Sequence, residues 1–181
     1  PTAYKQERWK YRHQVEQFIV RTATEKPPPP LRSPMFTGSA YIAVTRAFVR
    51  HVLEDPEAQQ FLEWAKDTYS PDEHVWATLN RAPGVPGAVP HNDKFQMSDM
   101  NALPRLVKWQ YLDGDTSRGA PYPPCTGRFQ RGVCIYGAGD VAWMLRQHHL
   151  LANKFDSEVD DAAIQCLESH LRRKALLGRG L

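Results

Sequence analysis

Cysteine is scarce in this sequence, and no charge of one sign dominates it. Its 181 residues include three cysteines, and 23 basic against 20 acidic side chains leave a net charge of +3. An excess so small and scattered forms no basic surface of the kind that binds nucleic acid. Paired cysteine spacings and a His-Glu-x-x-His motif, which would indicate a zinc site, are lacking as well. No metal site is therefore predicted.

Long apolar runs are also lacking. No run reaches the roughly 18 residues that cross a bilayer, and no signal peptide is visible. The chain opens at Pro1 without an initiator methionine. We therefore expect it to be a piece of a longer protein, and the lack of a targeting segment does not indicate where that protein resides.

Aromatic and aliphatic residues are plentiful and predict a packed body. The chain is 41% hydrophobic, with five Trp, seven Tyr and seven Phe. Strand and helix patterns alternate, so the predicted class is α/β. The expected strands are residues 39–44, 106–111 and 133–136. The expected helices are residues 5–20, one capped by Thr45, one from Asp55-Pro56 through Trp64, one from Ser70 through Leu79, one ending at Arg146, and one from Ser157 to Gly178.

Glu73 fits two interpretations. Ser70 and Glu73 have the spacing of a capping box, with Pro71 at the first helical position. A glutamate at a helix N-terminus can also direct its carboxylate out of the edge of an open α/β sheet, where ligands of such folds bind. The two roles are compatible, so Glu73 is a candidate for both.

Trp109 and Tyr111 alternate on the strand expected over residues 106–111, so they would point to the same face. Two such aromatics usually belong to the core. They can instead form a stacking platform for a sugar ring, whose C–H face is apolar. Both interpretations stay open on the pattern alone.

Two motifs suggest cofactors or metals but have ordinary explanations. Gly137-Ala138-Gly139-Asp140-Val141-Ala142 fits the dinucleotide fingerprint, and Glu158 follows at about the expected distance. A dinucleotide-binding half needs further strand–helix units downstream, however, and only one helix remains. Asp113-Gly114-Asp115 spells a metal-binding triplet, but a strand-ending turn has the same composition. We favour a tight turn at both places.

His148 and His149 are adjacent, so on a helix they would diverge and could not face one metal. Cys125 and Cys134 bracket a short stretch with turn formers near its start. A hairpin there could bring them within disulfide reach, although spacing alone leaves the pairing open. Cys166 is odd, which suggests a missing partner or a free thiol.

Five longer motifs resemble one family, the core 2 β-1,6-N-acetylglucosaminyltransferases. They are Asp67–Glu73, Val107–Tyr111, Gly119–Cys125, Tyr136–Asp140 and His148–Asp156. The resemblance covers essentially the whole chain. Its mucin-type branch, which makes core 2 and core 4 structures, is the most similar by Met35-Phe36-Thr37-Gly38 and the C-terminal tail.

The resemblance implies a fold and a reaction. The fold would be the C-terminal part, residues 1–181, of a single GT-A-like catalytic domain. The reaction would be inverting, metal-independent and without a cofactor, with UDP-GlcNAc as donor and the 6-hydroxyl of GalNAc in a core 1 or core 3 mucin-type O-glycan as acceptor. Glu73 matches the catalytic base. Arg131 and Lys154 match the pair that neutralises the UDP diphosphate.

The resemblance also assigns acceptor and disulfide residues. Lys5 and Arg8 match basic residues that line the acceptor site, and Trp109 and Tyr111 match its aromatic contacts. The cysteines follow the family as well, with Cys125–Cys134 as one disulfide and Cys166 bonded to a cysteine near the start of the catalytic domain, outside this chain.

A carboxylate base and two fixed cations suit this chemistry, because a sugar hydroxyl is a poor nucleophile and UDP leaves with growing negative charge. The family's uridine-binding half, stem and membrane anchor would lie outside this chain. The parent would be a type II membrane protein of the Golgi lumen that modifies glycoproteins. Two alternatives remain: a non-catalytic glycan-binding module, and a nicotinamide-dependent oxidoreductase that rests on Gly137 and Gly139 alone.

Overall fold

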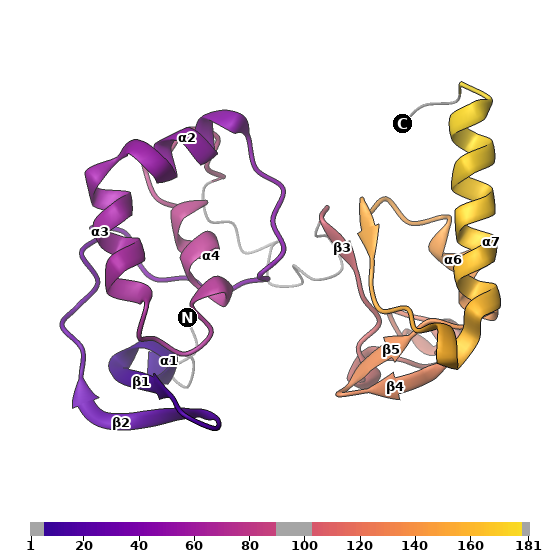
Figure 1. Cartoon of the computed structure of the whole chain (residues 1–181), viewed down its shortest axis with the longest axis horizontal. Helices are drawn as coiled ribbons and strands as arrows, with labels where there is room; N and C mark the ends of the chain where they lie inside the picture. Colours follow the sequence, from indigo (N-terminus) through magenta and orange to yellow (C-terminus); the bar gives the residue numbers. More distant parts are fainter. Residues whose placement is uncertain (1–5, 90–102, 179–181) are drawn as a thin grey trace. The chain divides into compact units, whose positions relative to one another are not determined.

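The computed structural model describes residues 6–89 and 103–178 (Figure 1). Helices and short strands are mixed along it, which is consistent with the expected α/β class. The chain divides into two compact units, residues 1–96 and residues 97–181, and each has a hydrophobic core. No helix of the described ranges combines the length and the apolar composition that crossing a membrane requires.

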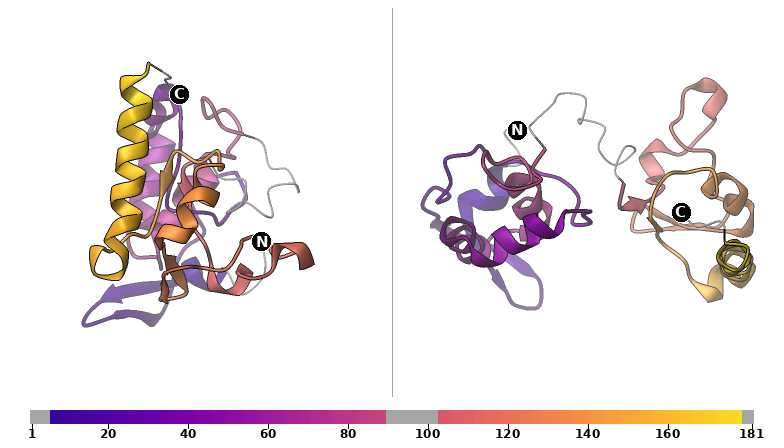
Figure 2. Two further views of the ribbon diagram at one scale, coloured as in Figure 1. Left: turned by 90° about the vertical axis from the view of Figure 1, so that its right-hand side faces the viewer. Right: turned by 90° about the horizontal axis from the view of Figure 1, so that it is seen from above.

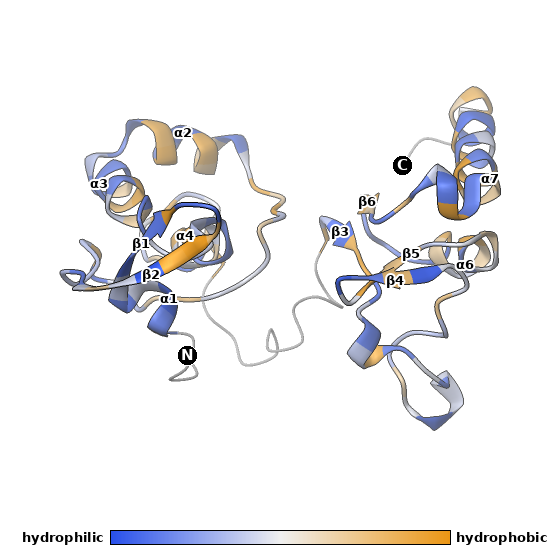
Figure 3. Cartoon of the chain, turned by 60° about the horizontal axis from the view of Figure 1, so that its bottom comes forward, coloured by the Kyte–Doolittle hydropathy of each residue, from blue (hydrophilic) through white to orange (hydrophobic). Residues whose placement is uncertain are grey.

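The first unit begins with a short helix and a hairpin, not with the long helix expected over residues 5–20. Its elements are α1 (Glu7–Lys10), β1 (Tyr11–Val15), β2 (Ile19–Glu25), α2 (Arg46–Glu54), α3 (Pro56–Ala65), a 3-10 turn (Pro71–Glu73) and α4 (Val75–Leu79). β1 and β2 pair antiparallel. β-branched residues crowd β2 and favour extended backbone. One end of β2 is coloured as hydrophobic in Figure 3. The first two residues of β2, Ile19 and Val20, are exposed.

Side-chain caps set the starts of α2 and α3, as the sequence predicts. Thr45 Oγ1 accepts a hydrogen bond of 3.1 Å from Phe48 N. Asp55 Oδ1 accepts one of 2.9 Å from Ala58 N, with Pro56 at the first helical position. Each side chain satisfies a backbone N–H that the first turn leaves without a partner.

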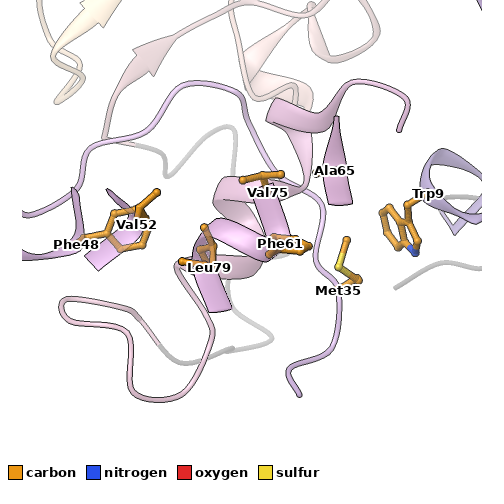
Figure 4. Packing of buried hydrophobic residues seen from close by; sticks show 9 residues of the cluster. Trp9, Met35, Phe48, Val52, Phe61, Ala65, Val75 and Leu79 are labelled. Carbon is orange, nitrogen blue, oxygen red and sulfur yellow. The ribbon is translucent and has the colours of Figure 1, made fainter. Parts of the chain in front are cut away.

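The core of the first unit gathers side chains from α1, α2, α3 and α4, as Figure 4 shows. Its buried members are Trp9, Met35, Phe48, Val52, Ala58, Phe61, Ala65, Val75 and Leu79. α2 offers only a narrow apolar strip, because Val49 and Leu53 are exposed. The strand expected over residues 39–44 is absent from the described structure: Tyr41 and Ile42 are exposed, and the segment has no neighbouring strand.

The second unit is built on short strands flanked by two helices. Its elements are β3 (Arg105–Leu106), 3-10 turns (Gln110–Leu112 and Thr116–Arg118), β4 (Arg128–Gln130), β5 (Val133–Ile135), α6 (Ala138–Met144), β6 (Leu151–Ala152) and α7 (Ser157–Leu176). β3 pairs parallel with β6, and β4 antiparallel with β5. α6 packs beside α7 (Figure 2).

The strand expected over residues 106–111 is much shorter than predicted. β3 ends at Leu106, and a 3-10 turn begins at Gln110. Between them Trp109 forms one isolated bridge with Val133, and Gln110 N donates to Gly132 O at 2.9 Å. The tip of the β4–β5 hairpin therefore takes up the backbone groups that a longer strand would have paired.

α7 starts at Ser157, but its cap is Asp156, whose carboxylate accepts from Glu158 N at 2.9 Å. Asp160 departs from helical backbone and accepts from Ala138 N at 2.7 Å as well as from Ala163 N at 3.1 Å. Asp160 thereby ties the start of α6 to α7.

Candidate functional site

Glu73 ends the 3-10 turn Pro71–Glu73, and its side chain takes no part in a capping box. Ser70 has left-handed backbone, with φ +44° and ψ 65°, and makes no side-chain cap hydrogen bond. An N-cap residue needs extended backbone to reach the second or third amide of the turn. The capping interpretation is therefore wrong, and the Glu73 carboxylate is left for another partner.

That partner is Arg8, which forms an ion pair with Glu73 through Nη1 and Oε2 although 65 residues separate them. The two side chains are 30% and 43% exposed. The Arg8 guanidinium also lies 5.5 Å from the ring centre of Tyr69. The first unit thus brings together two of the predicted site residues at a surface open to solvent. Lys5, the third, lies outside the described residues.

The backbone around this pair is fixed by hydrogen bonds. Tyr69 N donates to Arg8 O at 2.8 Å, and Gly38 N donates to Glu73 O at 2.7 Å. Glu73 N donates to Ser70 O at 3.0 Å. These bonds join three distant stretches of chain, so the carboxylate and the guanidinium are held by a common frame.

His74, directly after Glu73, is fully buried. Burial, followed by the charge of Arg8, lowers the pKa of His74 to about 4. The ring is therefore neutral near neutral pH. Sequence reasoning missed His74, and the only signal for it was its place next to Glu73.

Asp67 anchors the hairpin to the loop that leads to Glu73. Its carboxylate pairs with Lys26 and with Arg12, the latter at 2.6 Å, and His13 N donates to its backbone oxygen at 2.7 Å. Burial acts to raise the pKa of Asp67, but the hydrogen bond and charge of Lys26 and the charge of Arg12 together lower it. Sequence reasoning missed this anchor too.

In the second unit, Arg131 occupies the tip of the β4–β5 hairpin. Arg131 and Gly132 form its two-residue turn with positive φ angles of 53° and 73°, as tight hairpins require. Arg131 is exposed. Lys154 Nζ lies 3.5 Å from the carbonyl oxygen of the neighbouring Gln130. The two predicted diphosphate-binding cations therefore come to the same end of one hairpin.

Trp109 and Tyr111 lie beside this hairpin, but not on one strand face as predicted. Trp109 bridges Val133, and the turn after it carries Tyr111 back so that the two ring centres lie 6.1 Å apart at 34°. Trp109 is half-buried and Tyr111 is 74% exposed. The arrangement leaves aromatic surface open for stacking, which a core pair would not.

The second unit also contains a buried ion pair. Lys108 Nζ lies 2.5 Å from Asp140 Oδ1 and 3.2 Å from Pro124 O, and neither charged side chain is more than 1% exposed. Asp140 Oδ2 also accepts from Thr126 N at 3.1 Å, Thr126 Oγ1 at 2.9 Å and Gly137 N at 3.0 Å. These contacts give a structural role to Asp140, the acidic residue that follows Gly137 and Gly139 in the sequence.

The glycines of the dinucleotide-like motif serve packing. A Cβ added to Gly137 or to Gly139 would lie 2.8 Å from atoms of Thr126. Their backbone is thus covered by the Thr126 segment, whereas a pyrophosphate site needs it open. This geometry favours the tight turn over the oxidoreductase interpretation.

The Asp113-Gly114-Asp115 triplet also has a structural role. Asp115 accepts from Ser117 N at 2.9 Å and from Ser117 Oγ at 2.7 Å, and these bonds lower the pKa of Asp115. Asp115 therefore caps the 3-10 turn that begins at Thr116. The triplet thus joins two 3-10 turns and does not end a strand as expected, because β3 stops at Leu106.

His148 and His149 follow α6 and lie outside a helix. Their rings stack at 4.3 Å and 25°. Burial, followed by the charge of His148, lowers the pKa of His149. Stacked rings direct their nitrogen lone pairs in nearly parallel planes, so they do not converge on one ion.

Cys125 and Cys134 form a disulfide, with Cα atoms 5.9 Å apart, which confirms the expected pairing. Cys166 is a free, exposed cysteine on α7. The two bonded sulfurs lie within 4.8 Å of the Asp140 carboxylate. Disulfide sulfurs are not thiolate ligands, and Asp140 is occupied by internal donors, so this cluster is structural.

The comparisons with known proteins agree with these motifs. A family model described as Core-2/I-Branching enzyme matches residues 1–145. The β-1,3-galactosyl-O-glycosyl-glycoprotein β-1,6-N-acetylglucosaminyltransferase 3 of Bos taurus is 59% identical over 181 residues, which is all of this chain and 41% of that protein. The Homo sapiens protein of the same name is 56% identical over 182 residues, covering 42% of its length.

A viral relative is equally similar. The β-1,3-galactosyl-O-glycosyl-glycoprotein β-1,6-N-acetylglucosaminyltransferase of Bovine herpesvirus 4 (strain DN-599) is 58% identical over 181 residues, again 41% of its length. The chain thus spans about two-fifths of the length of the curated relatives it matches. With the family model covering residues 1–145, the chain belongs to the Core-2/I-branching enzyme family.

Proposed function

We propose that this chain carries the acceptor side and part of the donor side of an inverting, metal-independent β-1,6-N-acetylglucosaminyltransferase. The donor is UDP-GlcNAc, and the acceptor is the 6-hydroxyl of GalNAc in core 1 or core 3 mucin-type O-glycans, giving core 2 or core 4 branches. The proposal includes a GT-A-like fold in which both units belong to one catalytic domain of a Golgi type II membrane protein. Family membership and the relatives' names support the transfer of GlcNAc in this proposal.

The observation that carries the proposal is the Arg8–Glu73 ion pair. A carboxylate that is 43% exposed, free of a capping role and held by one guanidinium can reach a bound hydroxyl. In this proposal Glu73 takes the proton from the acceptor hydroxyl as that oxygen attacks the anomeric carbon. Arg8 holds the carboxylate in one orientation and contacts the acceptor, together with Lys5.

The donor half of the reaction is assigned to the hairpin of the second unit. UDP departs with growing negative charge, which Arg131 and Lys154 stabilise in place of a metal ion. An arginine binds a diphosphate through its bidentate fork, and a lysine acts as a point charge. Trp109 and Tyr111, which the resemblance assigns to the acceptor, lie beside the same hairpin tip and offer rings on which the acceptor sugar can stack.

Glu73→Gln in the full-length protein tests the base. Gln can keep a hydrogen bond to Arg8 but cannot take a proton, so turnover should fall by roughly 10²–10⁴-fold. The free energy of unfolding should change by less than about 1 kcal/mol, because no cap is lost. UDP binding should persist. Near-normal turnover by Glu73→Gln would remove the catalytic assignment.

Chelation and hairpin variants test the donor site. Excess chelator should leave turnover intact, whereas Arg131→Ala and Lys154→Ala should weaken UDP binding and turnover. Arg128→Ala is the matched control, because Arg128 is exposed at the other end of the same hairpin. Loss of activity on chelation that manganese restores would show that the enzyme needs a metal. Binding of O-glycan without any binding of UDP-GlcNAc would instead indicate a glycan-binding module.

A further inference from the structure

A buried hydrogen-bond chain ends beside Glu73. His74 Nε2 lies 3.0 Å from Thr68 Oγ1, and Thr68 Oγ1 lies 2.6 Å from Ala65 O. Ala65 is the last residue of α3, where helix carbonyls lack partners within the helix. The chain therefore connects the end of α3 to the residue that follows the proposed base. All three groups are buried.

The chemistry of Thr68 fixes the form of the His74 ring. A hydroxyl has one proton to donate, and the carbonyl of Ala65 can only accept. Thr68 Oγ1 therefore donates to Ala65 O and accepts from His74. It follows that His74 carries its proton on Nε2, and that the direction of its ring is set by the end of α3.

The ring also packs against the residue next to Arg8. Trp9 and His74 have ring centres 5.4 Å apart at 55°, and Trp9 belongs to the core of the first unit. Two consecutive residues, Arg8 and Trp9, thus face two consecutive residues, Glu73 and His74. The partly exposed Arg8–Glu73 ion pair is therefore adjacent along the chain to the buried Trp9–His74 ring pair.

We infer that His74, oriented by Thr68, is a positioning residue that holds the Glu73 carboxylate where it can take the acceptor's proton. This inference rests on the proposed role of Glu73. His74 touches no substrate, and it acts by fixing the backbone that carries Glu73. Its neutrality near neutral pH fits this role, since the hydrogen-bond chain keeps one arrangement over the working range.

Thr68→Val in the full-length protein is the central test, because it keeps the shape of the side chain and removes the hydroxyl that accepts from His74 and donates to Ala65 O. A small displacement of a catalytic group costs up to about 10²-fold in rate, so kcat should fall by roughly 10–100-fold. KM for UDP-GlcNAc should stay within about twofold, since the donor-binding residues are untouched. Thr68→Ser, which restores the hydroxyl, should recover most of kcat.

Thr78→Val is the matched control. Thr78 is a buried threonine of the same core, whose hydroxyl lies 3.3 Å from Phe36 O and accepts from Phe36 N at 3.0 Å. It should lower the melting temperature at least as much as Thr68→Val while leaving kcat unchanged. Equal kcat values for Thr68→Val and Thr78→Val would overturn the inference.

His74→Gln and His74→Leu give a second comparison, which does not depend on whether the Thr68→Val variant folds. Gln retains an N–H donor and Leu does not, so Gln should have the higher kcat at equal melting temperature. If Glu73→Gln abolishes turnover while Thr68→Val keeps it, Glu73 is the base but His74 does not position it. If Glu73→Gln keeps turnover, both the catalytic role of Glu73 and the positioning role of His74 are rejected.

Discussion

The buried Lys108–Asp140 pair should be the most sensitive point of the second unit. Asp140→Asn would leave the Lys108 ammonium fully buried without a counter-charge, and breaking such a pair typically costs about 3–5 kcal/mol. Lys108→Met should cost less. The Asp140 carboxylate would keep three donors, namely Thr126 N, Thr126 Oγ1 and Gly137 N. Asp140→Asn is therefore expected to lower the free energy of unfolding more than Lys108→Met does.

The double variant makes the prediction sharper. Adding Lys108→Met to Asp140→Asn removes the stranded charge, so the double variant should be more stable than Asp140→Asn alone. Amide hydrogen exchange at Thr126 and Gly137, which donate to Asp140, reports the local opening free energy. A loss below about 1 kcal/mol for Asp140→Asn, or a double variant less stable than that single one, would refute the reasoning.

Two further predictions concern the first unit. Its stability should fall as the pH drops from 6.5 towards 4, because unfolded His74 binds a proton in that window and buried His74 does not. The full effect on the free energy of unfolding is about 3 kcal/mol. Urea unfolding at each pH measures it, and His74→Gln should abolish it. A pH-independent stability in the unaltered protein would contradict this. Ser70→Ala should change the free energy of unfolding by less than about 0.5 kcal/mol, because Ser70 caps nothing; a thermal-melting loss equal to about 1 kcal/mol would indicate a working cap.

Local signals in the sequence predicted local features well. Thr45 and Asp55 cap their helices as expected, since a cap depends only on residues within one turn. The Cys125–Cys134 disulfide, which spacing alone left open and the family resemblance implied, links β5 to the segment before β4. The strand expected over residues 133–136 is confirmed to within one residue as β5.

Patterns that needed a distant partner were predicted poorly. Residues 5–20 have an amphipathic helical pattern, but the chain turns there into a hairpin anchored through Asp67. The strand expected at 106–111 ends at Leu106, because the hairpin around Gly132 takes the next backbone groups. Hydrophobic period describes which face is apolar and not which segment will lie against it.

The sequence by itself determined the family, through long ordered motifs, and the residue types that the proposed chemistry needs. Only the tertiary structure decided how they are used. It paired Glu73 with Arg8 across 65 residues and freed Glu73 from its expected cap. It also buried His74 behind this pair. An ion pair between distant residues and the burial of a ring depend on packing of the whole unit, which no local spacing encodes.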